Sequence, residues 1–341
     1  MKQRIIQLLV GAFVLIFVLF ITSFKLPFYI YQPGNASELD PFVEIDGGYD
    51  SEGDMHLVTV RGGQATPIYY LWAKVRPYYH IYDLEEIRPE GISQEEYNHI
   101  QLQSMNSSQD TAIAVAFDAA GKEYSYEYNG VYVLHVEEGM PAFNVLKVGD
   151  QILSVDGKAI ERTEDISDYV TSKTEDDSVE VEFIRDGETR TEKVGLTTFP
   201  DSPETVGMGI GLVADREIVT SPEISINSGD IGGPSAGLMF SLEIFDQLTE
   251  KDYTKGYKIC GTGTISEDGT VGPIGGIDQK VVASDNDGCD LFFAPNQNGE
   301  KDSDFQVASK TAKEIETDMK VIPVDTFTEA VTYLEALEPK S

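Results

Sequence analysis

The chain has 341 residues, too many for one ordinary domain, so its length predicts two or three domains with separate cores. Its formal net charge of −34 would repel phosphate, which argues against nucleic acid or anionic lipid as a partner, and we expect no nucleic-acid partner; solubility is the simplest reason for this charge. Only two cysteines occur, Cys260 and Cys289, too few for a disulfide scaffold and without the spacing of metal ligands. We expect both in core strands, where a single bridge is possible, and we expect no metal or other cofactor.

An apolar run without a charge extends from Ile5 to Phe24, and its roughly twenty residues suit the hydrocarbon core of a bilayer. It is either a signal peptide or an anchor. We expect a retained signal anchor over residues 1–27, because the run is longer than a usual signal sequence and no Ala-x-Ala cleavage site follows it. Lys2 and Arg4 precede the run, which predicts a single-pass cell-membrane protein whose larger part lies outside the cytoplasm.

The next segment, residues 28–118, is predicted to be a mixed α/β region. Two stretches alternate like strands, Phe42 to Ile45 and His56 to Val60, and a helix is expected from Ser93 to about Asn106. Aromatic residues between Tyr69 and Tyr79 indicate either a core or a docking face. Phe28, Tyr29 and Tyr31 fit an aromatic belt at the membrane surface, or else they begin the first folded element.

Residues 119–200 have a clearer pattern of strands and turns. Val131 to Val136 predicts a strand, Gly139 to Ala142 a turn, and Leu146 to Gly157 a strand that closes in an Asp-Gly turn. The sequences Gly-Met-Pro-Ala and Lys-Val-Gly-Asp-Gln-Ile-Leu-Ser-Val-Asp-Gly resemble those of PDZ domains associated with bacterial proteases.

The resemblance to PDZ domains implies a groove in which an extended peptide joins a sheet edge. The expected peptide-binding residues are Gly130, Val131, Tyr132 and Val133, although the usual Gly-aromatic-Gly-aromatic form is not present there. The alternative is a module that acts only as a spacer or gate for the next domain.

In the last predicted domain, residues 201–341, Ser235 lies between Pro234 and two small residues. The apolar positions from Leu238 to Leu248 predict a helix with one buried face, and the glycines before Pro234, including Gly233, allow close approach of another backbone. Free amides at the start of that helix are able to stabilise an oxyanion. Two interpretations therefore stand: Ser235 is a nucleophile, or it is an ordinary helix cap.

A serine nucleophile needs a base, and no histidine occurs after His135, which excludes a Ser-His-Asp triad confined to this domain. Lysine can serve if burial among apolar groups keeps it neutral. Lys280 follows Gly275-Gly276 and leads into Val281-Val282-Ala283, so its stem begins on an apolar helix face, whereas the other lysines of the domain have polar or acidic neighbours. The alternative for Lys280 is an ordinary surface charge near a helix start.

Three motifs, in this order, resemble the proteolytic domain of Lon over most of residues 205–296. They are Gly-Pro-Ser-Ala-Gly at 233–237 before an apolar helix, Gly-Thr-Gly-Thr-Ile at 261–265, and Val-Gly-Pro-Ile-Gly-Gly-Ile-Asp-Gln-Lys at 271–280. The resemblance implies that Ser235 is the nucleophile and Lys280 the general base and acid. It also implies that the hydroxyl of Thr262 helps to hold the lysine, and that amides beside Ser235 form the oxyanion hole.

One departure is that the acidic residue that Lon enzymes carry close before Gly-Pro-Ser stands farther upstream here, at Asp230. No P-loop sequence occurs, which predicts a protease that needs no nucleotide. Anchor, PDZ-like module and Lon-like domain together resemble the YlbL-type membrane-anchored proteases of Gram-positive bacteria.

The predicted fold class is therefore multidomain α+β, with a transmembrane helix, a PDZ-like β-sandwich or barrel with helices, and an α/β domain of the Lon-protease type. The predicted function is that of a serine endopeptidase acting on protein or peptide substrates, and homo-oligomers are possible. The rival hypothesis is a proteolytically inactive PDZ adaptor that binds membrane-proximal partners.

Overall fold

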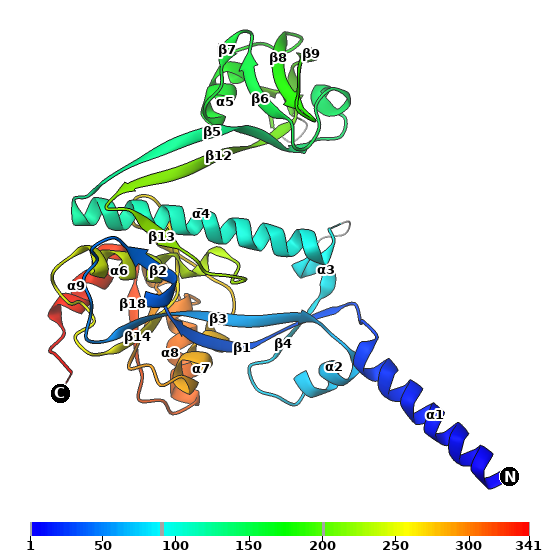
Figure 1. Ribbon diagram of the computed structural model, residues 1–341, viewed down its shortest axis with the longest axis vertical. Helices are drawn as coiled ribbons and strands as arrows, with labels where there is room; N and C mark the ends of the chain where they lie inside the picture. The colour runs from blue at the N-terminus through cyan, green and yellow to red at the C-terminus, as the bar shows by residue number, and fades with distance from the viewer. Residues whose placement is uncertain (1, 89–91, 200–201, 341) are drawn as a thin grey trace. The chain divides into compact units, whose positions relative to one another are not determined.

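The computed structural model describes residues 2–88, 92–199 and 202–340. The chain divides into two compact units (Figure 1). Unit 1 consists of Met1–Glu123 together with Ser221–Ser341, and unit 2 consists of Tyr124–Thr220.

The N-terminal helix α1 (Lys2–Ser23) contains the only candidate membrane span in the described part of the chain. The span covers Gln3–Ser23, and none of its most apolar window is buried inside the protein. Its length and composition suit a membrane anchor or a signal sequence.

Unit 1 is built on a six-stranded sheet of order β18-β17-β14-β3-β1-β4. Pairing is parallel between β18 and β17, between β17 and β14, and between β14 and β3, whereas β1 is antiparallel to β3 and β4. The bounds are β1 Phe28–Glu38, β3 Asp54–Gln64, β4 His80–Asp83, β14 Lys258–Gly261, β17 Leu291–Pro295 and β18 Lys320–Val324.

This sheet corrects the expectation of a separate region over residues 28–118. β3 pairs with β14 from Asp54 opposite Lys258 to Leu57 opposite Gly261, so segments about 200 residues apart in the sequence share one sheet. The physical reason is that β14 is short and buried, and needs a hydrogen-bonding strand on both sides. Residues near the N-terminus provide one of the two.

Helices cover both faces of this sheet (Figure 1). On one side α6 (Gly237–Leu248) is buried along its whole length and packs against α4 (Gln94–Ala120). On the other side lie α7 (Ile277–Asn286) and α8 (Asp304–Glu314), which contact each other. The remaining elements of unit 1 are α2 Pro67–Ala73, α3 Leu84–Ile87, α9 Phe327–Ala336, β2 Val43–Ile45, β13 Ile224–Ile226, β15 Thr264–Ile265, β16 Val271–Gly272 and the short 3-10 helices η1 Asp40–Phe42, η3 Pro234–Ala236 and η4 Gln297–Gly299.

The helix α4 begins where the sequence predicts but continues well past Asn106. Ser93 and Glu96 form a capping box at its start, and Gly121, with φ of 64°, ends it. The extension is apolar all round, from Ala112 to Phe117, because it is buried in the unit. It therefore lacks the one-sided pattern by which a surface helix is found.

The aromatic residues after the anchor lie in β1, where Tyr29 is buried and the ring of Phe28 packs on that of Tyr70. These aromatic residues therefore begin the first folded element, which was one of the two alternatives, and do not form an exposed belt.

Unit 2 is built on a six-stranded sheet of order β12-β5-β6-β8-β9, with β7 paired to β6, and β10 and β11 form a separate two-stranded sheet. The predicted turn at Asp156-Gly157 is confirmed, since both residues have positive φ, and Asp186-Gly187 has the same conformation between β8 and β9. The predicted boundary at residue 200/201 lies outside the described residues, but β12 follows it and still belongs to this unit. The bounds are β5 Glu123–Val136, β6 Gln151–Val155, β7 Lys158–Ala159, β8 Ser178–Arg185, β9 Glu188–Gly195, β10 Thr197–Phe199, β11 Ser202–Gly207, β12 Ile210–Ser221, α5 Thr163–Thr171 and the 3-10 helix η2 Pro141–Asn144.

Candidate active site

Ser235 lies in the 3-10 helix η3, immediately before α6, and its side chain is partly exposed. The hydroxyl caps neither helix: the N-cap positions are Gly233 and Ala236, and neither makes a side-chain capping bond. The structure therefore removes the interpretation of Ser235 as a helix cap. Gly233 has φ of 91°, which a glycine adopts without strain.

The long helix α4 holds the serine loop in place. The N–H of Gly233 donates to the carbonyl oxygen of Gln101 at 2.8 Å, and Ser108 Oγ donates to the carbonyl oxygen of Pro234 at 3.0 Å. A Cβ on Gly237 would lie 2.7 Å from Ser108 Oγ, so only glycine allows α6 to start this close to α4. The N-terminal segment thus fixes the backbone on both sides of Ser235.

Lys280 lies in the first turn of α7, and its side chain points into the protein rather than to solvent. The residue is 2% exposed, and its Nζ lies 2.7 Å from Ser235 Oγ and 2.9 Å from Thr262 Oγ1. The two residues singled out from the sequence are thus within hydrogen-bonding distance of each other. The alternative of a surface charge does not hold for Lys280.

Thr262 follows β14 and is fully buried. Its Oγ1 accepts a hydrogen bond from Lys280 Nζ and donates one of 2.9 Å to the carbonyl oxygen of Ser235. The N–H of Gly263 donates to that same oxygen at 2.8 Å. The residues after β14 therefore connect the lysine to the backbone of the serine.

Burial lowers the pKa of Lys280 to about 7, because a charged ammonium loses its hydration there. The nearby carboxylate of Asp304 acts in the opposite direction and raises the lysine pKa. Asp304 is itself largely buried, and that burial raises its own pKa. A lysine with a pKa near 7 is partly neutral at neutral pH, so its nitrogen can accept a proton.

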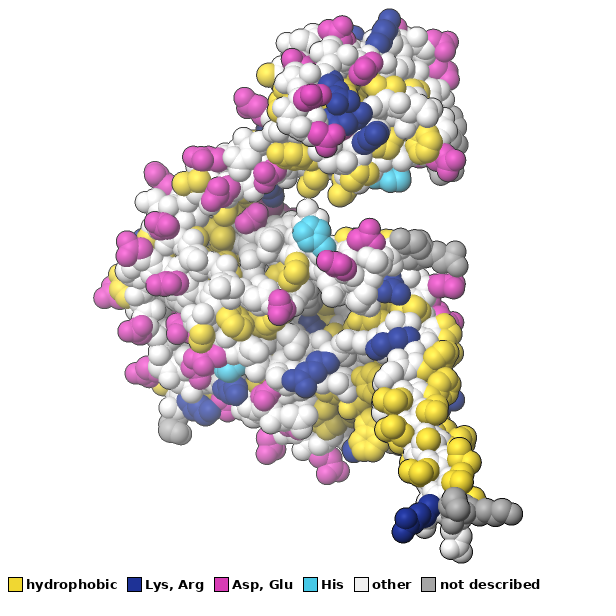
Figure 2. Space-filling model, turned by 45° about the vertical axis from the view of Figure 1, so that its right-hand side comes forward, with side chains coloured by type: hydrophobic (Ala, Val, Ile, Leu, Met, Phe, Trp, Pro, Cys, Tyr) yellow, Lys and Arg dark blue, Asp and Glu magenta, His cyan; other side chains and the backbone are white. Residues whose placement is uncertain are grey.

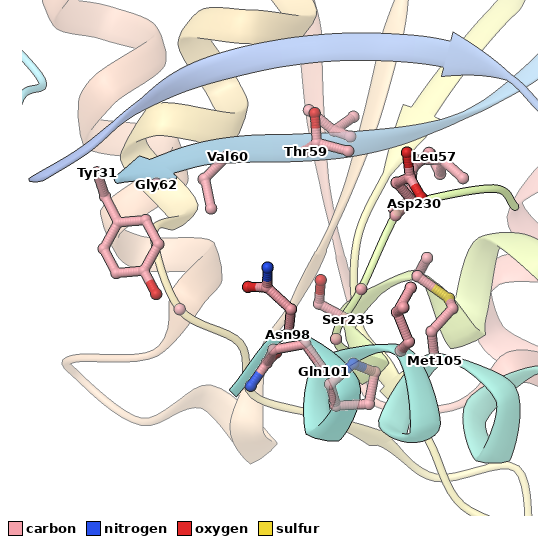
Figure 3. Close-up of a pocket in the computed structure, with 18 of the residues that line it drawn as sticks. Tyr31, Leu57, Thr59, Val60, Gly62, Asn98, Gln101, Met105, Asp230 and Ser235 are labelled. Carbon is pink, nitrogen blue, oxygen red and sulfur yellow. The ribbon is translucent and has the colours of Figure 1, made fainter. Parts of the chain in front are cut away.

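A cavity of about 480 Å³ opens over Ser235. Figure 3 shows its two walls: Leu57, Thr59 and Val60 of β3 face Asn98, Gln101 and Met105 of α4, with Ser235 between them. Tyr31 lies toward one end of the cavity, and Asp230 lies toward the other. Lys280 contributes to the lining beside the serine.

The wall formed by β3 has a free edge above the serine. β14 pairs with β3 only as far as Leu57 and Gly261, while β3 continues to Gln64 with β1 on its other side. In the described part of the chain no strand pairs with Val58–Gly62 on the side that β14 has left. Free main-chain groups along a cavity wall suit an extended polypeptide.

A histidine from outside residues 201–341 could also serve as the base if the fold placed it near Ser235. The structure places His56, His80 and His99 in the same unit as Ser235. None of the three is among the described residues that line the cavity. Lys280 therefore remains the base that geometry favours. No group of three or more His, Cys, Asp or Glu side chains suited to a metal ion is found within the described residues.

The predicted peptide-binding residues Gly130–Val133 lie in β5, and this part of the prediction is wrong. β5 is an interior strand between β12 and β6, and Val131 and Val133 are buried in the core of unit 2. An interior strand has no free edge for a peptide, because both of its sides already carry hydrogen-bonded strands.

A second sequence pattern, which the sequence analysis overlooked, is typical of a peptide-binding groove. Met208-Gly209-Ile210-Gly211 alternates glycine with apolar residues and leads into β12, the edge strand of the sheet. Gly209 has φ of 80°, and Met208 is buried while Ile210 packs against the core. A glycine loop before an exposed edge is what a peptide-binding module of this kind requires.

The two cysteines form a disulfide, an outcome that the sequence left open. Cys260 lies in β14 as expected, but Cys289 follows the end of α7 and lies outside any strand. The bridge therefore joins the strand that leads to Thr262 with the end of the helix that carries Lys280.

Comparisons with known proteins agree with the two domains predicted from the sequence. Residues 102–196 match the family described as PDZ domain, and residues 218–336 match the family described as Lon protease (S16) C-terminal proteolytic domain. The Lon protease of Metamycoplasma arthritidis (strain 158L3-1) is 32% identical over 117 residues, which are 34% of this chain and 13% of that protein. The Lon protease of Campylobacter concisus (strain 13826) is 34% identical over 94 residues, or 28% of this chain and 11% of that protein.

The chain thus spans about an eighth of the length of these curated relatives. Among solved structures, the PDZ domain of an SdrC-like protein from Listeria monocytogenes is 34% identical and covers 26% of this chain and 90% of that chain, with a TM-score of 0.24.

Proposed function

We propose that this chain, which combines a PDZ domain with a proteolytic domain of the Lon type, is a serine endopeptidase that uses Ser235 as nucleophile and Lys280 as general base. The observation that supports the proposal most strongly is the 2.7 Å distance between Lys280 Nζ and Ser235 Oγ, together with a lysine pKa lowered to about 7. A neutral amine at this distance can remove the hydroxyl proton.

The reaction begins when the lone pair of Lys280 Nζ takes the proton of Ser235 Oγ as that oxygen attacks a peptide carbonyl carbon. The carbonyl oxygen gains negative charge, which main-chain amides beside Ser235 stabilise. The resulting ammonium then gives its proton to the leaving amine, and the peptide bond breaks to leave an acyl-enzyme. Water, deprotonated by the same lysine, attacks the ester, and its hydrolysis restores the hydroxyl of Ser235.

Thr262 has a positioning role in this scheme. Its hydroxyl donates its only proton to the carbonyl oxygen of Ser235, so it can only accept a hydrogen bond from Lys280. This bond keeps the lysine nitrogen beside Ser235 Oγ. Main-chain groups of Val58–Gly62 align the substrate as an extended strand across the serine. A folded domain has no free strand to offer, so unfolded segments are the expected substrates.

We further propose that α1 anchors the protein in a membrane and that both units lie outside the cytoplasm. Lys2 and Arg4 before the apolar run support this orientation. The Cys260–Cys289 disulfide supports it independently, because such bonds persist in oxidising compartments. The absence of a P-loop sequence in this chain supports cleavage without nucleotide.

The PDZ domain is proposed to recruit substrate or to control its access. The edge of β12 after Met208-Gly209-Ile210-Gly211 supports peptide recruitment by strand addition.

The test is cleavage of unfolded casein by the full-length protein in detergent, together with labelling by a serine-reactive probe. Ser235→Ala and Lys280→Ala should each lose cleavage by about 1,000-fold or more, and Ser235→Ala should lose labelling. Ser107→Ala, an exposed serine on α4, is the matched control and should keep both. Undiminished cleavage by Ser235→Ala would refute the proposal, and a wild-type protein that neither cleaves nor labels would favour the inactive adaptor.

A further inference from the structure

The short helix α2 presents a second apolar stripe, on the side that faces away from the protein. Its inner residues, Tyr69, Tyr70 and Ala73, pack in a cluster with Ile30 and Ala65. The outer residues of α2 and of the turn after it follow the spacing i, i+3, i+4 and i+7 and are half to three-quarters exposed: Ile68 49%, Leu71 66%, Trp72 49% and Val75 76%. A soluble surface helix normally has polar residues on this side.

This outer stripe adjoins the end of α1. The two helices are in contact, and the segment after α1 is hydrogen-bonded to the segment before α2: the N–H of Leu26 donates to the carbonyl oxygen of Ala65 at 2.8 Å, and Gln64 Nε2 donates to the carbonyl oxygen of Leu26 at 2.9 Å. Figure 2 shows hydrophobic side chains that cover α1 and continue onto the surface where this helix meets the rest of the unit. A bilayer spanned by α1 would therefore lie next to α2.

The charge of this region is opposite to that of the whole chain. Acidic residues make up 59 of 341 positions, about one in six, yet residues 1–37 and 55–82 contain none. The same two stretches carry six cations: Lys2, Arg4, Lys25, Arg61, Lys74 and Arg76. These two stretches form α1, α2 and most of β1, β3 and β4, whose remaining residues Glu38, Asp54 and Asp83 are acidic. Exposed acidic residues return directly after these stretches, at Asp83, Glu85 and Glu86, and Asp83 pairs with Phe28 beside the end of α1. The outer side of α2 itself and the turn after it carry cations only.

Two of these cations are held beside aromatic rings of α2. Lys74 Nζ lies 4.8 Å from the ring centre of Tyr70, and the guanidinium of Arg76 lies 4.3 Å from that of Trp72. An aromatic ring with a cation at its side fits the boundary of a bilayer, where the ring meets acyl chains and the cation meets lipid phosphates.

We propose that α2 docks on the surface of the membrane that α1 spans, with Ile68, Leu71, Trp72 and Val75 in the lipid–water boundary and Lys74 and Arg76 on anionic headgroups. This inference rests on the proposed anchoring by α1. Docking at a second point restricts rotation of unit 1 about α1, and so sets the height and direction of the cavity over Ser235 relative to the bilayer.

Trp72 is the single tryptophan of the chain, so its fluorescence reports on α2 alone. The experiment places the full-length protein in vesicles of phosphatidylcholine and phosphatidylglycerol, with bromine on the upper acyl carbons of the lipids as a quencher. We expect co-flotation with the vesicles and loss of about half or more of the Trp72 emission. The control is Trp72→Phe combined with Tyr49→Trp, an exposed position just after β2, and its emission should remain.

The variant Leu71→Gln/Val75→Gln should lose most of the quenching, and Lys74→Gln/Arg76→Gln should lose it in vesicles rich in phosphatidylglycerol. All four side chains lie outside the catalytic cavity, so casein cleavage in detergent should be unchanged and shows that each variant is folded. Co-flotation with unquenched Trp72 emission would overturn the docking alone. Failure to co-float would overturn the anchoring as well. A blue-shifted emission without quenching would place a second copy of the chain on α2 and would also overturn the docking.

Discussion

Lys280 Nζ donates a 2.9 Å hydrogen bond to Thr262 Oγ1, and both residues are closed off from solvent. Because the hydroxyl proton of Thr262 points to the carbonyl oxygen of Ser235, this bond has one direction only. The lysine is therefore held by an uncharged acceptor, which orients its nitrogen without favouring the charged form as a carboxylate would.

Replacement of Thr262 by valine should lower kcat about 10- to 100-fold with little change in KM, because the lysine loses its orientation while the substrate wall on β3 is intact. Steady-state cleavage of a fluorogenic peptide measures both constants. Thr262→Ser keeps a hydroxyl and should restore most of the rate. Equal losses in the valine and serine variants would mean that Thr262 acts through packing alone.

The rate of cleavage should rise with pH along an alkaline limb with an apparent pKa of about 7, since only the neutral form of Lys280 accepts the proton of Ser235. Single-turnover cleavage between pH 5 and pH 9 measures this limb. A rate that stays flat across pH 7 would contradict a lysine base with this pKa.

Asp304→Asn should shift the alkaline limb of the rate to lower pH, because the carboxylate of Asp304 raises the pKa of Lys280 and the amide does not. The amide oxygen can still accept the hydrogen bond that the N–H of Ile274 gives to the carboxylate. Asp302→Asn is the matched control, since Asp302 is exposed and two residues away, and its limb should not move. A shift to higher pH in Asp304→Asn would overturn the assigned effect.

Ser235 and Lys280 could be identified from the sequence as candidate catalytic residues, because the order of the motifs and the chemistry of the residues agreed on them. A serine before an apolar helix needs a base, and the absence of histidine after His135 left lysine as the candidate. What the sequence could not provide was the distance between their side chains, because Ser235 and Lys280 are 45 residues apart and lie on separate elements, η3 and α7.

The contribution of the N-terminal segment to the sheet and to the cavity could not be predicted from the sequence. Pairing of β3 with β14 depends on a non-local contact, and no local pattern records which strand a distant strand will join. As a result, the sequence assigned no function to residues 28–118, although Gln101 and Met105 of α4 form one wall of the cavity and Val60 of β3 lies on the other. The interior position of Val131 in unit 2 was missed for the same reason, since β12, the strand on its other side, comes about 80 residues later.

Loss of the Cys260–Cys289 bridge in Cys260→Ser/Cys289→Ser should destabilise unit 1 by about 3 kcal/mol, the usual effect of a bond that closes a loop of this length. Denaturation of the full-length protein, followed by the fluorescence of Trp72, measures the change in unit 1. Addition of a reductant should destabilise the wild type in the same way and leave the double variant unchanged. A wild type insensitive to reductant under conditions that reduce the bond would refute the stabilising role.

Lys280→Met should raise the free energy of unfolding of unit 1 at neutral pH, although the loss of the general base should abolish cleavage. The lysine pKa is about 7 in the folded protein and 10.5 when exposed, so the unfolded chain binds more protons between these values. The stability of the wild type therefore rises with pH across this window, and from pH 7 to pH 9 this contribution amounts to about 2 kcal/mol. Methionine fills a similar space and carries no charge, so the variant should lack the rise.

Denaturation followed by Trp72 fluorescence at pH 7, 8 and 9 gives the difference in the free energy of unfolding between wild type and Lys280→Met at each pH, in which the contributions of titrating groups that do not interact with Lys280 cancel. That difference should shrink toward alkaline pH. Lys310→Met is the control, because the side chain of Lys310 is 77% exposed and its removal should leave the pH dependence of the wild type in place. A difference that stays constant with pH would mean that Lys280 is charged in the folded protein, and a charged lysine cannot take the proton of Ser235.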